Sequence, residues 1–308
     1  MGYELSKNES IAENIRRMWS QELSVAIETL ENSGNEPDKA IHDVRKSIKK
    51  IRAVLRLVKH DMGKEMFGKE NIRYRNIGHL LSHVRDATVM IKTLYKLRET
   101  NRRVIPRVAY TNAQKKLSAR QVEISKHFFE DNQSIAAVLT ALREAQQQQP
   151  QVSVSKESFS VFAVNIHQIY KRGKKAYAHA SKQPSIDSFH ELRKEVKVLW
   201  YHTRILKPAW PSIMESYATE LGVLSELLGN DHDMGVLYEE IKSGRLSFGR
   251  KATASTILKL IESYRENLQQ QLYPMARRVF AERAKDYTSR LKVYWTIWCK
   301  ENMLEQTV

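Results

Sequence analysis

The sequence is poor in three residue types that shape folds. Its 308 residues include one cysteine, Cys299, 11 glycines and 7 prolines. A single cysteine excludes an intramolecular disulfide and fits a reducing compartment. Because glycine and proline interrupt helices, their scarcity favours long helices over a turn-rich β architecture. The sequence also lacks an apolar stretch of the roughly 20 residues that span a bilayer. It lacks a signal-peptide pattern as well, so we expect a soluble, cytoplasmic protein.

Acidic residues are in the minority. The chain has 51 lysines and arginines against 35 aspartates and glutamates, which gives a formal net charge of +16 at pH 7. Both halves contribute, because residues 1–150 carry a net charge of +9 and residues 151–308 one of +7. A field of this sign attracts polyanions such as nucleic acid, an anionic membrane surface or polyphosphate.

Helical periodicity and one polar linker organise the chain. The glutamine run 146–149, Pro150 and a Ser/Val-rich stretch to about Ser158 have the composition of a linker between two domains, 1–150 and 151–308. Pro274 is expected to kink or divide the last helix. The sequence predicts four helices on each side of the linker, and thus an all-α protein of two tandem helical bundles. The expected helices are 8–32, 38–60, 70–99, 107–146, 158–181, 186–206, 211–242 and 250–300.

Two blocks of sequence occur twice in the same order. Residues 42–49 read HDVRKSIK and residues 190–197 read HELRKEVK, so His, Arg, Lys and Lys keep their offsets 148 residues apart. Farther along, residues 81–89 match residues 228–236 at a leucine, an aspartate and a valine, with His232 at the position of Arg85. Repeats of this length are subdomains rather than short solenoid units.

The first block of each pair forms an amphipathic helix with a basic face. At 100° per residue, one side of each helix is apolar and the other carries a basic ridge about 20 Å long. Like charges four residues apart destabilise a helix. Two basic ridges with the same spacing of their charges therefore favour a function over a merely solvated surface. The expected inward residues are Val44, Ile48, Ile51, Leu55 and Val58 in the first copy, and Leu192, Val196, Leu199 and Leu206 in the second.

The duplicated motif His-x-x-Arg-Lys-x-x-Lys, followed each time by a Leu…Asp-x-x-Val block, resembles the CHAD family, the conserved histidine α-helical domain. The resemblance extends over nearly the whole chain. It implies two similar four-helix bundles related by pseudo-twofold symmetry, with a basic groove or pore where they meet, and binding of inorganic polyphosphate there. The contacts that it implies are His42, Arg45, Lys46, Lys49, Arg52, Arg56, His190, Arg193, Lys194, Lys197 and Arg204. The sequence departs from the family at Trp200, the counterpart of Arg52, and at His232, where the family has arginine.

Other basic residues are candidates for the same surface. Lys171, Arg172, Lys174 and Lys175 precede the second repeated helix, and Arg75, His79 and His83 follow one another at four-residue intervals. An ordinary solvated face explains both sets equally well.

Alternative functions leave weaker signals. A zinc site at His79 and His83 would need a glutamate where Leu80 stands, and Mg²⁺ chemistry would need clustered carboxylates, so we expect no metal, cofactor or catalysis. RNA or DNA is the main competing ligand. Binding of bases would favour aromatic residues among the cations; the first ridge has none, and Trp200 and Tyr201 lie on the second. Docking on acidic protein tails is a third possibility. The expected protein is a stand-alone monomeric module that binds polyphosphate, away from membranes and in association with polyphosphate granules.

Overall fold

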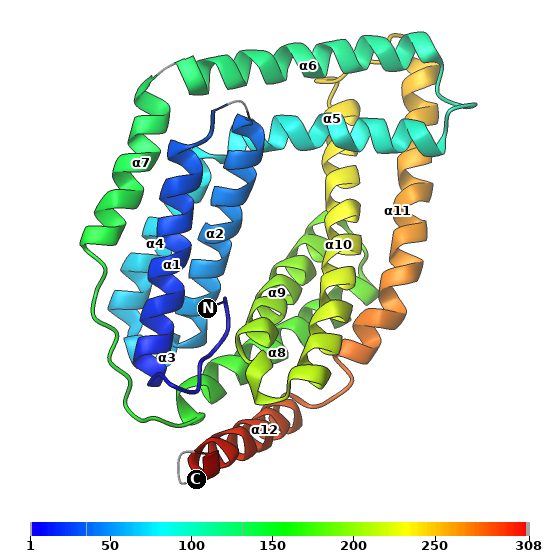
Figure 1. Ribbon diagram of the computed structural model, residues 1–308. Helices are drawn as coiled ribbons and strands as arrows, with labels where there is room; N and C mark the ends of the chain where they lie inside the picture. Colours follow the sequence, from blue (N-terminus) through cyan, green and yellow to red (C-terminus); the bar gives the residue numbers. More distant parts are fainter. Residues whose placement is uncertain (1, 35, 131, 306–308) are drawn as a thin grey trace.

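The computed structural model describes residues 2–34, 36–130 and 132–305, and its regular structure in these ranges is helical (Figure 1). This confirms the prediction of an all-α protein. The α-helices are α1 (Ile11–Glu31), α2 (Pro37–Leu57), α3 (Lys59–Met62), α4 (Lys64–Leu80), α5 (Ser82–Thr100), α6 (Arg107–Glu130), α7 (Asn132–Gln147), α8 (Ser160–Lys182), α9 (Ile186–Ile205), α10 (Pro211–Lys242), α11 (Lys251–Val279) and α12 (Ala284–Glu305), and η1 (Lys207–Ala209) is a 3₁₀ helix. In the described ranges no helix is long and apolar enough to cross a membrane.

Most predicted helices are present, but three of them are divided. The predicted helix 70–99 breaks at Leu81, between α4 and α5. The predicted helix 107–146 corresponds to α6 and α7, which point in different directions (Figure 1). Residue 131, between them, lies outside the described residues. The predicted linker, 146–158, is helical at Gln146 and Gln147, and the chain is not helical from residue 148 to residue 159, between α7 and α8.

The last predicted helix is divided at a different place from the one expected. Pro274, expected to kink or divide the helix, lies inside α11, which continues to Val279, so the helix is not divided at this proline. The chain leaves the helix where Phe280 turns into the core against Tyr170, with ring centroids 5.5 Å apart. Lys174 then donates hydrogen bonds to the carbonyls of Ala281 and Glu282, at 3.3 and 2.8 Å. Packing and a satisfied helix end therefore decide the boundary, not the missing amide of proline.

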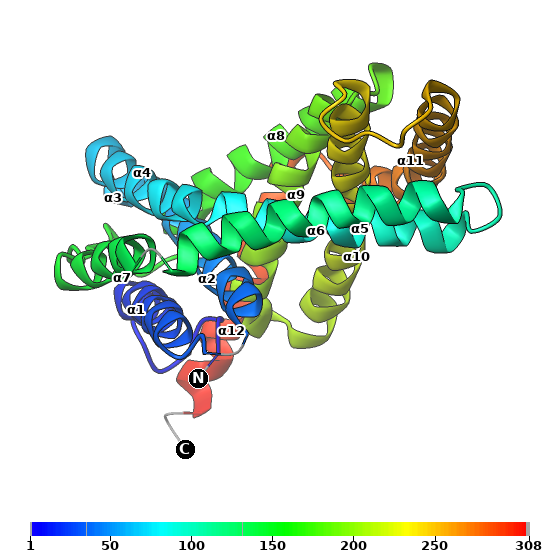
Figure 2. The same ribbon diagram turned by 90° about the horizontal axis from the view of Figure 1, so that it is seen from above.

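The helices form two groups joined by a long hairpin. Helices α1, α2, α4 and α7 lie on one side and α8–α11 on the other, while α5 and α6 extend from the first group across to α10 and α11 (Figures 1 and 2). A separate apolar cluster fixes this crossing, with Leu94 of α5 and Leu117 of α6 packed among Leu237, Ile257 and Ile261. Residues 1–150 therefore supply a structural element to the second half of the chain.

The two repeated helices, α2 and α9, pack against each other in the middle of the molecule. All nine residues expected to face inward are buried. Helix α2 begins at Pro37, as predicted, and α9 begins with a capping box in which Ser185 and Ser188 exchange hydrogen bonds. At the crossing, Nε2 of the buried His202 lies 2.9 Å from the Ala53 carbonyl oxygen. The basic faces of both helices are thereby held at one interface.

Candidate polyanion-binding site

A cavity of about 540 Å³, here called the central basin, lies where α2, α5, α9 and α10 meet. It receives side chains from both copies of both repeated blocks, so residues about 148 positions apart in the sequence face the same space. Its lining is His42, Arg45, Lys46, Lys49, Arg85, Asp86, Val89, Met90, Thr93, His190, Arg193, Lys197, Trp200, Tyr201, His232, Asp233 and Val236.

The lining is strongly unbalanced in charge. Six lysine or arginine side chains face two carboxylates, those of Asp86 and Asp233. Asp86 favours the charged form of Arg45, because it raises the arginine pKa against the effect of burial. Burial raises the pKa of Asp233, and the neighbouring Arg193 and Arg85 oppose that rise. The two carboxylates hold the cations together without neutralising them.

The two matched arginines differ in how they are held. Arg45 donates from Nη1 to the Gly78 carbonyl at 2.6 Å, which fixes its guanidinium against the end of α4. Within the part of the chain that the structure describes, the Nε–H of Arg193 is buried without a hydrogen-bond partner. This side of the guanidinium lies against Gly229 of α10, so Arg193 is placed by packing, whereas Arg45 is placed by a hydrogen bond.

Two matched lysines are held in the basin against electrostatic repulsion. Burial, followed by the charges of Arg193 and Arg45, lowers the pKa of Lys49 to about 7. The Lys49 side chain is solvent-exposed. The side chain is thus accessible to solvent, but protein atoms on both walls of the cavity reduce the hydration of its ammonium group. Burial and Arg193 likewise lower the pKa of Lys197 to about 8, and its ammonium lies 4.5 Å from the centre of the Trp200 ring.

A pair of histidines closes one end of the basin. The Nδ1 atoms of His190 and His232 are 3.3 Å apart, so one ring must donate to the other. Burial, then the charges of His190 and Arg193, lowers the pKa of His232 to about 4. Burial is also the main cause that lowers the pKa values of His42 and His190 below 6.5. Burial therefore favours the uncharged form of these histidines, and an added anion would favour the protonated form.

The other predicted contacts of α2 and α9 lie outside the basin. Arg52 donates from Nε to Oδ1 of Asn71 on α4, at 3.1 Å, and Arg75 lies close enough to lower the Arg52 pKa. Glu195 accepts a hydrogen bond from the Nε of Arg172 at 3.0 Å. Burial lowers the pKa of Arg56, and the negative charge of Glu195 opposes this effect. The basic face of α2 is thus divided between the basin and a second group of cations toward α4 and α8.

The remaining predicted residues are dispersed. Arg204 stacks near the Trp200 and Tyr3 rings, at 5.1 and 5.8 Å, beside a neighbouring cavity. Lys194 is exposed and paired with Glu191, and Lys174 holds the chain after α11. Lys171, Lys175 and His79 are exposed on α8 and α4.

Sequence reasoning omitted several basin residues from the predicted contacts. Arg85 and His232 occupy matched positions of the second repeated block, and Trp200 and Tyr201 continue α9. The repeat itself was the available signal, since Arg85 and His232 each stand four residues after the leucine that begins the second repeated block, Leu81 and Leu228. A block that recurs without being basic can still belong to the site.

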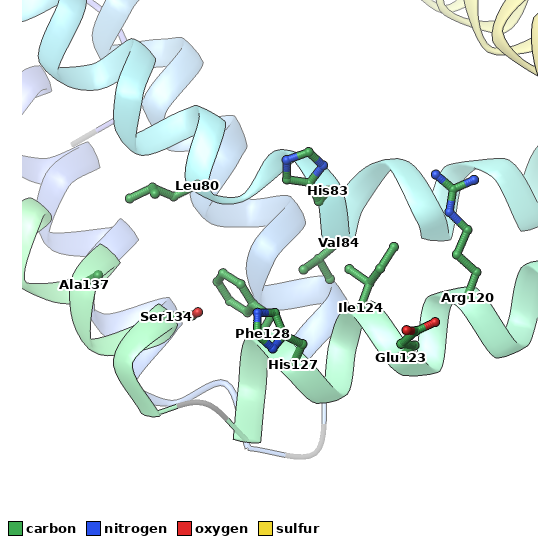
Figure 3. A pocket seen from close by; sticks show the side chains of 10 residues that line it. All are labelled: Leu80, His83, Val84, Arg120, Glu123, Ile124, His127, Phe128, Ser134 and Ala137. Carbon is green, nitrogen blue, oxygen red and sulfur yellow. The ribbon is translucent and has the colours of Figure 1, made fainter.

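A second cavity, of about 710 Å³, lies between α5, α6 and α7 (Figure 3). Its walls are mainly apolar, with Leu80, Ile124 and Phe128 directed into it and His83 at one edge. Arg120 reaches its rim but is already paired with Glu240 at 3.1 Å. We therefore assign the anion site to the central basin. Among the described residues, no three His, Cys, Asp or Glu side chains are grouped so as to hold a metal ion.

A buried ion pair supports the α10 wall of the basin. Asp231 has an exposed fraction of 0% and accepts from Nε and Nη2 of Arg265, each at 3.1 Å, and from Gln269 at 2.9 Å. Asp231→Asn would leave the largely buried guanidinium uncompensated. We expect a loss of about 3 kcal/mol in the free energy of unfolding.

Urea unfolding followed by circular dichroism measures this loss. Asp286→Asn is the control, because Asp286 forms an exposed pair with Arg283. That variant should unfold like the parent protein. Equal midpoints for the two variants would contradict a structural role for Asp231.

The comparison with family models places the chain. Residues 9–242, from the start of α1 to the end of α10, match the model of the CHAD domain. A comparison with curated proteins finds no match. The matched range contains both repeated blocks and all four helices that line the central basin. The chain therefore belongs to the CHAD domain family.

Proposed function

We propose that this protein binds inorganic polyphosphate in the central basin and does not act on it chemically. The observation that carries the proposal is the convergence of six lysine and arginine side chains, from both repeats, in one cavity. The matched arginines Arg45 and Arg193 support it further, because both line the cavity, one from each repeat. Arginine pairs with adjacent phosphate oxygens through two donors, whereas lysine acts as a point charge that lets the chain shift.

The site favours a polymer over a single phosphate. In the free protein, neighbouring positive charges destabilise the charged form of each lysine, as the lowered lysine pKa values indicate. A linear polyanion relieves this repulsion at several positions at once and releases counterions from its own length. Cations beyond the basin, at Arg56 and Arg172 on one side and Arg204 on another, would contact a chain that extends out of it.

Nucleic acid is the second candidate ligand. Trp200 and Tyr201 line the basin, and an aromatic ring beside cations suits base stacking. However, Lys197 and Arg204 already lie against the Trp200 ring, at 4.5 and 5.1 Å from its centre, so a base would compete with them. Polyphosphate needs no such displacement.

A competition titration distinguishes the two ligands. Labelled long-chain polyphosphate is bound at near-physiological salt and displaced by unlabelled polyphosphate or by single-stranded RNA of equal total charge. We expect polyphosphate to compete at least about tenfold better per charge, because only bare phosphates fit among the cations. Equal or better competition by RNA would transfer the proposal to nucleic acid.

The architecture and cellular setting follow from the same proposal. The family resemblance and the matched lining support two tandem helical bundles related by an internal pseudo-twofold axis through the basin. The α5–α6 hairpin would then be a part of the first bundle that packs against helices of the second. We further propose a cytoplasmic, monomeric binding protein that associates with polyphosphate granules and not with membranes.

A further inference from the structure

Lys49 is an accessible amine surrounded by cations. Its side chain is exposed to solvent inside the central basin. Arg45 lies one turn earlier on α2, Arg193 and Lys197 face it from α9, and Arg85 faces it from α5. Asp233 of α10 is the carboxylate close enough for Lys49 to lower its pKa. Lys46 and Asp86 also line the basin, so five other lysine or arginine side chains stand against two carboxylates, and this excess of positive charge favours the uncharged form of the amine.

An uncharged amine next to other cations is a nucleophile. Enzymes activate lysine in this way, by desolvation or by an adjacent positive charge. The lowered pKa of Lys49, about 7, agrees with this geometry. Lys197 shares much of the same environment, but its ammonium lies over the Trp200 ring, an interaction available only to the charged form. Of the two basin lysines with a lowered pKa, Lys49 is thus activated as a nucleophile, whereas Lys197 is stabilised in its charged form by the Trp200 ring.

The same cavity would also bind the leaving group of a phosphorylated acyl donor. Arg193 and Arg45 line the cavity from α9 and α2, and Arg45 is held beside Gly78 by a hydrogen bond. Guanidinium groups in these positions would hold a phosphate and stabilise the negative charge that develops on it. The nucleophile and the anion-binding groups thus face one space.

We propose that Lys49 is a site of covalent acylation by small acyl phosphates. The Nζ lone pair attacks the carbonyl carbon, and the bond between that carbon and the phosphate oxygen breaks. The electron pair leaves with inorganic phosphate, and the nitrogen loses one proton to water. The product is an uncharged amide on Lys49. No oxidant, reductant or metal takes part.

Acylation would also control ligand binding, a consequence that rests on the proposed function. An amide removes one positive charge from the most crowded part of the basin and adds bulk there. Bound polyphosphate would in turn protect Lys49, because it occupies the phosphate site and restores the ammonium form. Modified protein and polyphosphate-bound protein would then exclude each other.

The test uses acetyl phosphate as the probe and the complete chain at pH 7.5. Peptide mass spectrometry follows acetylation of Lys49 and of Lys116, an exposed lysine on α6. We expect Lys49 to react at least about tenfold faster than Lys116. The preference should be smaller with a neutral acetylating ester, which has no phosphate to bind. Equal rates at the two lysines, or equal preference for the two reagents, would overturn the inference.

Two variants and one ligand complete the test. Arg193→Gln and Arg85→Gln each remove a facing cation from a different helix, and both should reduce the Lys49 rate but not the Lys116 rate. Circular dichroism confirms that each is folded, so the result does not depend on one variant. Long-chain polyphosphate should slow acetylation at Lys49 alone. Rapid acetylation without protection would support the modification site and contradict polyphosphate binding.

Discussion

Replacing Arg45 and Arg193 together by glutamine is expected to weaken polyphosphate binding by at least about 100-fold, the largest effect of any pair in the basin. These are the matched arginines of the two repeats, and they approach the cavity from α2 and α9. The change removes two forked donors and two positive charges, while glutamine keeps a hydrogen-bonding side chain near the Gly78 carbonyl. Fluorescence titration with labelled polyphosphate, repeated at several salt concentrations, measures both the affinity and the number of charge contacts.

The control must remove equal charge elsewhere. Arg102 and Arg283 are exposed, and each is paired with a carboxylate three residues away, so Arg102→Gln with Arg283→Gln lowers the net charge by the same amount. We expect this variant to bind within about threefold of the parent protein, since exposed charges are screened. A similar loss in both double variants would show that net charge, and not the basin, sets the affinity. Circular dichroism checks that both remain helical.

The sequence predicted the parts of the fold that depend on local pattern. The apolar stripes of α2 and α9 are buried as expected, and α10 has the predicted bounds of 211–242. Periodicity is informative here because each helix has one buried face. The pairing of the repeats was also visible, because equal offsets in both copies place equivalent residues at equivalent positions. These features led to seven of the 17 residues that line the basin, all of them on α2 and α9.

What the sequence could not supply depends on tertiary packing. A helical wheel assigns Arg52 and Arg56 to the same face as Lys49, but Asn71 and Glu195 attract their guanidinium groups to other neighbours. Long side chains can follow partners that only the folded chain brings near. The crossing of α5 and α6 likewise depends on contacts with α10 and α11, far away in the sequence.

The crowded cations of the basin also couple binding to pH. In the folded protein the pKa of Lys49 is about 7, whereas an unperturbed lysine has a value of 10.5. Between these values the unfolded chain binds a proton that the free folded protein does not, so stability should rise with pH in this range. Bound polyphosphate reverses the preference, because it favours the ammonium form. Affinity should therefore fall as the pH rises above about 7 at Lys49, and above about 8 at Lys197.

Lys49→Gln is therefore expected to change stability and binding in opposite directions. Without the repelled ammonium the free protein should have a higher melting temperature at pH 6.5, where the parent lysine is mostly charged. Its affinity for polyphosphate at that pH should fall by about tenfold, since one central contact is lost. Lys49→Arg is the matched variant: it keeps a charge that does not titrate, so it should bind well and show a flatter decline between pH 7 and 9.

Calorimetry and titration across pH 6–9 measure both quantities on the three proteins. At pH 9 the folded protein has released the Lys49 proton, but the unfolded chain still binds it, so the gain in melting temperature from Lys49→Gln should be clearly smaller than at pH 6.5 and should vanish only near pH 10.5. A constant gain across the range would mean that lost charge repulsion is not its cause. The opposite trends have one physical origin, because the repulsion that weakens the empty basin is relieved when a polyanion enters it. Selection for binding would then preserve Lys49 at the expense of the free protein's stability.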